Sequence, residues 1–243
     1  MPNALILGAT SDMAVAIAHK FASEGYSLSL AARKVEHLKP IQSDLHIRHQ
    51  VKVGVYAFDA ADFASHQTFT QNLSQRPDVA VCVFGYLGEQ PKAQTDWQEA
   101  QRIIDTNYTG AVSVLNLLAN EMEQRGSGTI VGISSVAGDR GRMSNYLYGS
   151  AKAGFTTYLN GMRNRLAHSG VHVVTVKPGF VQTKMTESLD LPKPLTAQPK
   201  EVANDVYKAF KKQKNTIYTK WFWRWIMLII KTVPEPIFKK MKM

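Results

Sequence analysis

The stretch Tyr148-Gly149-Ser150-Ala151-Lys152 places a phenol and an ammonium group four residues apart. Residues at this spacing on a helix lie on one face, so the two side chains would be neighbours. A phenol ordinarily titrates at about pH 10, and a nearby cation lowers its pKa, which makes the tyrosine usable as an acid or a base. The ordinary alternative is an amphipathic helix with a buried tyrosine and a surface lysine. The rest of the sequence has to decide.

Two more polar residues stand where side-chain chemistry is expected. Asn107 lies in the middle of a long helical pattern at about 96–125, where asparagine is a poor helix former, so a polar role is expected for it. Ser135 directly follows an apolar strand pattern at 129–134 and precedes Tyr148 by thirteen residues.

The start of the chain has the pattern of a dinucleotide-binding unit. An apolar strand at 4–7 leads into the small-residue turn GATSDMA at 8–14 and then into a helix. We expect phosphate to approach the main-chain N–H groups of this turn and the positive end of the helix. Asp12 and Ala14 stand where glycines are usual, although alanine still allows close packing and Asp12 could cap the helix. The predicted cofactor contacts here are Gly8, Thr10, Ser11, Asp12 and Met13.

The ends of the next two strands suggest which nucleotide is bound. The strand at 27–32 is followed by Arg33 and Lys34, where an NAD-binding unit usually has an acid for the ribose 2′-hydroxyl. Because a 2′-phosphate calls for a cation, this pair favours NADP(H); the alternative is two solvated charges at a helix start. The strand at 51–58 ends at Asp59, which could accept a hydrogen bond from the adenine amino group.

The remaining pattern alternates strands and helices. Further strands are expected at 78–86, 171–177 and 216–219, with helices at about 63–73, 148–168 and 200–212. This alternation predicts a Rossmann-type, doubly wound parallel α/β sheet of about seven strands in one domain, residues 1–219. Residues 185–199 are polar, carry three prolines and suit a flexible substrate lid.

Composition excludes several classes of protein. The chain has 243 residues with 44% apolar and 20% charged side chains, as in ordinary globular proteins. Its net charge of +10 is concentrated in residues 208–243, which hold ten Lys or Arg and one acid, so no nucleic-acid partner is expected. Cys82 is the only cysteine, and we predict neither a disulfide nor a metal site. Because no secretory signal pattern opens the sequence, we expect a cytoplasmic protein.

Residues 220–243 form a predicted tail with a basic, aromatic helix. The run WFWRWIMLII at 221–230 contains three tryptophans and is too short to span a bilayer, which takes about 20 apolar residues. Aromatic residues beside Lys and Arg suit a helix lying on the inner face of an anionic membrane. The alternative is that the tail docks on another subunit of a homo-oligomer.

Taken in order along residues 1–219, these motifs resemble the short-chain dehydrogenase/reductase family. The resemblance rests on GATSDMA, Asp59, Asn107, the ISS of 133–135, Tyr148-x-x-x-Lys152, and Pro178-Gly179 with Thr183. The step from Ser135 to Tyr148 matches the family and selects Ser135 over Ser134 and Tyr148 over Tyr146. One departure is Phe84-Gly85-Tyr86, where the family commonly shows Asn-Asn-Ala-Gly.

The resemblance implies hydride transfer at a carbonyl or alcohol with a nicotinamide cofactor. Tyr148 would donate the proton, and Lys152 would lower the pKa of Tyr148 and bind the nicotinamide ribose. Ser135 would orient the carbonyl, and Asn107 would hold a water for proton relay. The further cofactor contacts that it implies are Phe84, Gly85, Tyr148, Lys152, Pro178, Gly179, Val181 and Thr183.

Several stretches, among them VFGYLGE, SSVAGDRGRMSNYLYGSAKAG and IMLIIKTVPEPIFKK, look most like ketoreductases of cell-wall biosynthesis that reduce a 2-keto pentofuranose carried on a polyprenyl phosphate. Such enzymes work with an oxidase as an epimerase pair. Arg140 and Arg142 could bind the substrate phosphate, or could lie in a solvated loop. The alternatives are a soluble reductase of a small or carrier-bound ketone, and a non-catalytic dinucleotide-binding regulator.

Overall fold

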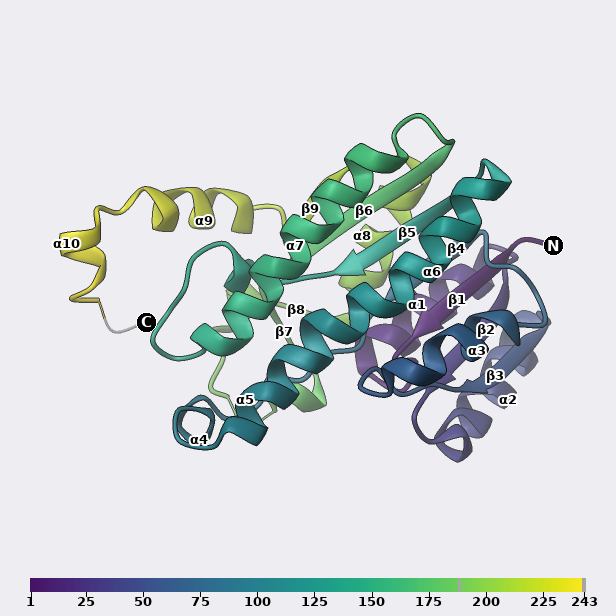
Figure 1. Cartoon of the computed structure of the whole chain (residues 1–243), viewed down its shortest axis with the longest axis horizontal. Coiled ribbons are helices and arrows are strands. Elements are labelled where there is room, and N and C mark those ends of the chain that lie inside the picture. Colours follow the sequence, from purple (N-terminus) through teal and green to yellow (C-terminus); the bar gives the residue numbers. More distant parts are fainter. Residues whose placement is uncertain (188, 242–243) are drawn as a thin grey trace.

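The computed structural model describes residues 1–187 and 189–241. Ser188, Lys242 and Met243, which fall in the predicted lid and tail, lie outside the described residues. Within the described part, a seven-stranded parallel sheet has the order β3-β2-β1-β4-β5-β6-β9 (Figure 1). The strands are β1 (Asn3–Leu7), β2 (Ser27–Ala32), β3 (Val53–Ala57), β4 (Val79–Cys82), β5 (Gly128–Ile133), β6 (Val171–Pro178) and β9 (Thr216–Thr219).

Helices cover both faces of this sheet, which confirms the doubly wound prediction. One apolar core joins the sheet to α1 (Asp12–Ser23), α2 (Leu38–His49) and α8 (Pro199–Lys211). A second core joins the other face to α3 (His66–Gln71), α6 (Gly110–Arg125) and α7 (Tyr146–Leu166). Every residue of β1 and of β4 is buried, as expected for strands covered on both faces.

The sheet has its switch point between β1 and β4. The chain winds outward from β1 to β3 and then returns to β4 on the other side of β1. The connections after β1 and β4 therefore leave in opposite directions and open a crevice at the carboxyl ends of these strands. Ligands bind at this position in open α/β sheets.

Three predicted elements have different bounds in the structure. The strand expected at 78–86 ends at Cys82, and Val83–Tyr86 continues into the crevice. The helix expected at 96–125 is divided into α5 (Trp97–Ile104) and α6 by a π-helical turn, Asp105–Thr109. Helix α2 was not predicted, because its sequence has weak apolar periodicity and buries only Leu38 and Leu45.

The lid is partly ordered into short elements. Strand β8 (Thr196–Ala197) pairs in parallel with β7 (Phe180–Val181), which follows β6 directly. Short 3₁₀ helices cover Lys184–Thr186 and Lys193–Leu195. The end of the lid is thereby attached to the loop that carries Pro178–Thr183.

The tail forms α9 (Trp223–Thr232) and α10 (Glu235–Phe238), which project from one end of the molecule (Figure 1). Trp223 and Met227 of α9 are buried against Val136 and half-buried neighbours. Trp225, Leu228 and Ile229 are more than half exposed on its outer side. Among the described helices, none has the length and hydropathy needed to cross a bilayer.

Candidate active site

A cleft of about 360 Å³ lies at the switch point of the sheet. Ten of the residues predicted to bind a cofactor line it: Gly8, Thr10, Ser11, Asp12, Met13, Arg33, Asp59, Phe84, Gly85 and Thr183. They come from the carboxyl ends of β1, β2, β3 and β4 and from the loop after β7. Residues more than 170 positions apart in the sequence therefore share one cavity.

The turn after β1 fits a phosphate-bearing ligand. Gly8 has φ of +85°, and a Cβ there would lie 2.7 Å from Phe84, so only glycine fits this position without strain. The turn leads into the N-terminus of α1, whose partial positive charge favours an anion.

Asp12 does not cap α1 as predicted. The cap is Ser11, whose hydroxyl accepts a hydrogen bond from the Ala14 N–H at 3.3 Å. Asp12 instead accepts one from the Lys184 N–H at 2.8 Å. This contact connects the start of the lid to the turn after β1. Asp12 and Lys184 also line a second cavity, of about 700 Å³.

Sequence reasoning missed part of the cleft. Arg102, Thr106 and Lys184 also line it, and Arg102 stacks over the Tyr86 ring at 4.1 Å. These residues lie in a helix or a loop with no motif, so no signal marked them beforehand. Among the described residues, those lining the cleft do not include six predicted contacts: Lys34, Tyr148, Lys152, Pro178, Gly179 and Val181.

Asn107 and Lys152 meet at the end of β4. A Cβ on Gly85 would lie 2.9 Å from the Asn107 Oδ1 and 3.5 Å from the Lys152 Nζ, so both side chains pack against this glycine. Asn107 is buried in the π-helical turn; its amide donates to the Tyr86 O at 2.6 Å and the Ile103 O at 2.8 Å. The amide group thus joins α5 to the segment after β4, which explains an asparagine in the middle of the helical region.

Lys152 is the one cation among the predicted catalytic residues, and it is deeply buried. It is 3% exposed, and its Nζ donates to the Ile133 carbonyl at 3.2 Å. Burial lowers the pKa of Lys152 to about 8. The ammonium is therefore close to releasing its proton near neutral pH.

Tyr148 and Ser135 are the two residues predicted to act on the substrate oxygen, and they interact with each other. Burial raises the pKa of Tyr148 to about 12, while a hydrogen bond from the Ser135 hydroxyl opposes this increase. The expectation that Lys152 lowers the pKa of Tyr148 is not met, because desolvation of the phenol dominates. The Lys152 Nζ lies 5.7 Å from the centre of the Tyr148 ring and makes its hydrogen bond to a backbone carbonyl.

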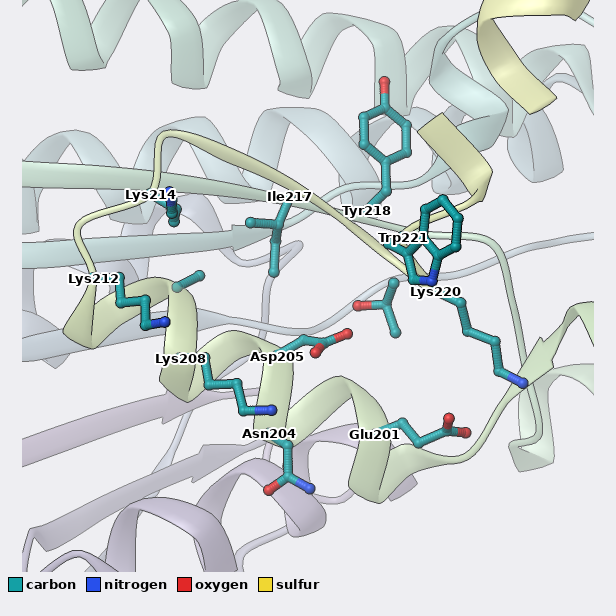
Figure 2. Close-up of a pocket in the computed structure, with 12 residues that line it drawn as sticks. Glu201, Asn204, Asp205, Lys208, Lys212, Lys214, Ile217, Tyr218, Lys220 and Trp221 are labelled. Carbon is teal, nitrogen blue, oxygen red and sulfur yellow. The ribbon is translucent and has the colours of Figure 1, made fainter. Parts of the chain in front are cut away.

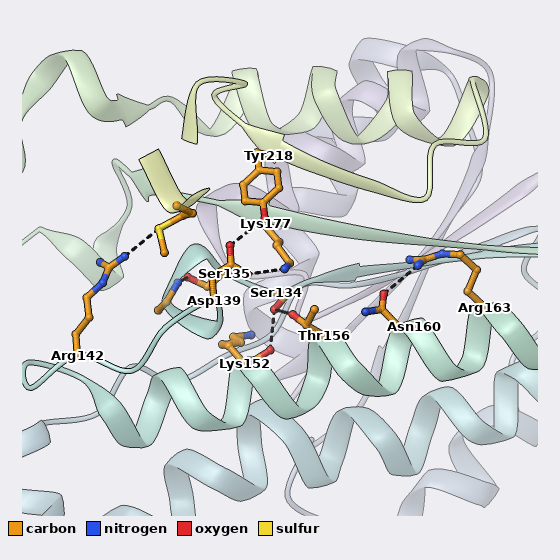
Figure 3. Close-up of polar contacts among 12 residues, drawn as sticks. Ser134, Ser135, Asp139, Arg142, Lys152, Thr156, Asn160, Arg163, Lys177 and Tyr218 are labelled. Atoms are coloured by element: carbon orange, nitrogen blue, oxygen red, sulfur yellow. Dashed lines mark hydrogen bonds and ion pairs between the residues drawn. The ribbon is translucent and has the colours of Figure 1, made fainter. Parts of the chain in front are cut away.

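Ser134 and Ser135 have different surroundings (Figure 3). The Ser134 hydroxyl is buried, donates to the Lys152 O at 3.0 Å and lies 2.7 Å from the Thr156 hydroxyl. It therefore attaches the end of β5 to α7. Ser135 is half-buried and interacts with Tyr148, which agrees with its selection over Ser134.

The loop that follows Ser135 is anchored by a buried ion pair. The Lys177 Nζ lies 2.6 Å from the Asp139 carboxylate, which also accepts a hydrogen bond from the Tyr218 hydroxyl at 2.9 Å (Figure 3). Both side chains of the ion pair are at most 10% exposed. The loop position is thus fixed by strands β6 and β9.

Arg140 and Arg142 do not form the free phosphate site that the sequence suggests. Arg140 donates to the carbonyls of Ile230 at 2.6 Å and Val233 at 2.7 Å. It also pairs with Glu235 at 2.9 Å, so its guanidinium caps the C-terminus of α9. Arg142 is half-buried, burial lowers its pKa, and it donates to the Met227 sulfur at 3.2 Å.

A separate groove of about 480 Å³ lies between α8 and β9 (Figure 2). Lys208, Lys212, Lys214 and Lys220 line it with Asp205. None of the predicted catalytic or cofactor residues is among the described residues that line this groove, so it is distinct from the cleft at the switch point.

The fold and the site together define a dinucleotide-binding oxidoreductase. The turn at Gly8, the N-terminus of α1 and the cleft at the switch point fit a nicotinamide dinucleotide. Such a cofactor supplies the hydride. A family model described as short chain dehydrogenase matches residues 2–193, and the chain therefore belongs to that family. The family resemblance stated from the motifs is confirmed.

Similar proteins agree with this class. An uncharacterized oxidoreductase of Mycobacterium tuberculosis is 34% identical over 240 residues, covering 98% of this chain and 96% of that protein. A sulfoacetaldehyde reductase of Chromohalobacter salexigens is 32% identical over 188 residues, covering 74% of this chain and 73% of that protein. A solved short-chain dehydrogenase from Sphingobium yanoikuyae in complex with NADPH has a TM-score of 0.81, 22% identity and 97% coverage of both chains.

Proposed function

We propose that this oxidoreductase is an NADPH-dependent ketoreductase acting on a keto-sugar carried on a polyprenyl phosphate. The observation that carries the reductase chemistry is the meeting of Ser135, Tyr148 and Lys152 beside the dinucleotide cleft. With a pKa of about 12, Tyr148 holds its proton at neutral pH and can give it to the carbonyl oxygen. The Ser135 hydroxyl orients the carbonyl, and Lys152 holds the nicotinamide ribose.

The preference for NADPH rests on Arg33. This exposed guanidinium lines the cleft at the end of β2, where the ribose 2′-position of a dinucleotide lies in such folds. Arginine matches a phosphate with forked hydrogen bonds. Lys34 is exposed beside the cleft and adds positive charge.

Arg33→Asp should reverse this preference. The carboxylate would repel the 2′-phosphate and accept a hydrogen bond from a 2′-hydroxyl, so the NADPH/NADH ratio of kcat/KM should fall by about 100-fold, or about 3 kcal/mol. Steady-state kinetics with both cofactors measure this ratio, with Arg48→Asp on the exposed surface of α2 as the control. An unchanged ratio would refute the assignment of NADPH.

The lipid-linked substrate class rests on the tail, residues 220–243. Trp221, Trp225, Leu228 and Ile229 give the tail an outer apolar side, and they are between 51% and 73% exposed. The neighbouring cations include Lys220, Arg224 and Lys231, whereas the only acid of the tail, Glu235, is paired with Arg140. Because apolar side chains with adjacent cations complement an anionic bilayer, we propose that the tail lies on the inner membrane face.

The reductase would then act where a polyprenyl phosphate presents its sugar. An oxidase that forms the 2-keto sugar would be its partner in an epimerase pair. The loop Val136–Asn145 lies between Ser135 and Tyr148 and contacts α9 through Val136 and Arg140. A lipid surface at α9 would thus bring the sugar close to the catalytic group.

The test is NADPH oxidation with a 2-keto pentofuranosyl polyprenyl phosphate in phosphatidylglycerol vesicles. We expect the lipid-linked sugar to have a kcat/KM at least about 100-fold above that of the same keto-sugar phosphate without its chain. We also expect the protein to sediment with these vesicles and not with neutral ones. The triple variant Trp225→Ser/Leu228→Ser/Ile229→Ser should stay in the supernatant, since it loses the outer apolar side.

A soluble reductase for a small carbonyl compound is the second candidate. It is favoured by the similarity to a sulfoacetaldehyde reductase over 74% of this chain. Faster turnover of a short soluble ketone or aldehyde than of the lipid-linked sugar would select this candidate. Equal sedimentation with anionic and neutral vesicles would count against the membrane surface.

A further inference from the structure

Trp223 joins the tail to the loops around the active site. It begins α9 and is only 3% exposed, although the helix lies at the end of the molecule. The residues packed around it belong to the loop after β6, to the lid and to the loop after Ser135. The mechanism above does not use this side chain.

The first contact of Trp223 is with the loop Pro178–Thr183. A Cβ on Gly179 would overlap the indole ring, so the ring occupies the space of a side chain at that position. The Phe180 ring packs edge-on against the indole at 5.3 Å between centroids. Gly179 was predicted to contact the cofactor but lies outside the cleft lining, and its contact with the indole accounts for a glycine here.

The second contact is with the end of the lid. The Trp223 Nε1 donates a hydrogen bond to the Leu195 carbonyl at 3.2 Å. Leu195 precedes strand β8, which pairs with β7, so the indole is attached to the lid just before it rejoins the loop after β6.

The third contact is with the residue that follows Ser135. Val136 is 4% exposed and belongs to the same apolar cluster as Trp223 and Met227. At the far end of α9, Arg140 binds the Ile230 and Val233 carbonyls, so the loop between Ser135 and Tyr148 holds both ends of the helix. Small shifts of α9 would therefore move the segment that carries Ser135.

We infer that Trp223 is a positioning residue that sets the relative position of the Ser135 loop, the Pro178–Thr183 loop and the lid. It acts through Gly179, Leu195 and Val136 and touches neither the phenol nor the ammonium of the catalytic group. The inference rests on the reductase chemistry proposed above and does not depend on the identity of the ketone. Displacements of about 1 Å in such a site cost up to about 100-fold in rate.

Trp223→Phe tests this role, because phenylalanine keeps an aromatic ring and loses the hydrogen bond to the Leu195 carbonyl. With any soluble ketone that the wild-type enzyme reduces, kcat should fall by about 10-fold and the KM for NADPH should rise by about 3-fold. Trp97→Phe, at the exposed start of α5, should match the wild-type enzyme in both constants. A lowered melting temperature with both constants within twofold of wild type would show a purely structural role and overturn the inference.

A double-mutant cycle locates the effect at Gly179. Gly179→Ala alone should lower kcat/KM by about 10-fold or more, because the new Cβ displaces the indole. In a Trp223→Ala background the same change should cost less than about twofold, since the space is then open. Equal losses in the two backgrounds would refute the proposed route. Loss of the lipid-linked activity alone, with this coupling intact, would instead refute the proposed substrate.

Discussion

Tyr148→Phe is expected to lower kcat by about 1,000-fold, in the range by which a positioned acid or base accelerates a reaction. The variant keeps the ring, which packs against the apolar cluster of Ala93, Ala100 and Ile103, and removes only the hydroxyl. NADPH binding should therefore stay within about twofold of wild type, and the loss should appear in kcat. Stopped-flow measurement of NADPH oxidation, with nucleotide fluorescence to follow binding, separates the two effects.

The matched control for this change is Tyr146→Phe. Tyr146 lies two residues earlier, at the start of α7, and is 43% exposed. Removal of the Tyr146 hydroxyl should leave kcat unchanged. A Tyr148→Phe enzyme that retained more than about a tenth of wild-type turnover would contradict the assignment of Tyr148 as proton donor.

As the proposed proton donor, Tyr148 should also give the two reaction directions different pH dependences. Because burial raises its pKa to about 12, the phenol stays protonated at neutral pH and the proton donor is present for ketone reduction. Alcohol oxidation needs the phenolate, so its rate should rise with pH below that pKa. Initial rates in both directions between about pH 6 and 10 test this difference.

Lys152→Met is expected to separate activity from stability. Turnover should fall by about 100-fold or more, because the variant loses the cation near Tyr148 that we propose holds the nicotinamide ribose. The unfolding free energy at pH 7 should rise by about 2 kcal/mol, because the variant no longer buries a charge. In the variant the Ile133 carbonyl loses its hydrogen bond from the Lys152 Nζ. This loss keeps the gain in stability below the full cost of burying the ammonium.

The pH window of this stability gain follows from the pKa of Lys152. Burial depresses it to about 8 in the folded protein, below the ordinary value of 10.5. Between these values the unfolded chain binds more protons, so the wild-type protein gains stability as the pH rises. The advantage of Lys152→Met should be complete below about pH 8 and should vanish towards about pH 10.5. Chemical denaturation at a series of pH values measures the difference in unfolding free energy between the variant and the wild type. A difference that did not change with pH would refute the depressed pKa of Lys152.

The sequence predicted the sheet and the cleft because their signals are local. Apolar runs followed by Gly8, Arg33 and Asp59 mark strand ends, and the ends of parallel strands must lie at one edge of the sheet. The step from Ser135 to Tyr148 reflects one loop of fixed length between β5 and α7. Such features depend on neighbours in the sequence, which pattern reasoning can detect.

Features that depend on distant contacts could not be predicted in the same way. The sequence suggests a phosphate ligand for Arg140, but its guanidinium caps a helix about 90 residues away. The pKa of Tyr148 follows from burial, which a four-residue spacing does not report. The hydrogen bond from the Lys184 N–H to the Asp12 carboxylate links residues 172 positions apart and has no motif.

The π-helical turn at Asp105–Thr109 has a consequence for the wall of the cleft. An α-helix advances about 100° per residue. One extra residue in a turn therefore rotates the side chains before the turn relative to those after it. Helix α6 keeps its apolar side on the sheet, while Arg102 of α5 is turned to face the cleft. Deleting one residue of the turn would restore an unbroken α-helix and rotate Arg102 by that angle. The continuous helical segment α5–α6 can therefore direct side chains of α6 into the core and Arg102 of α5 into the cleft.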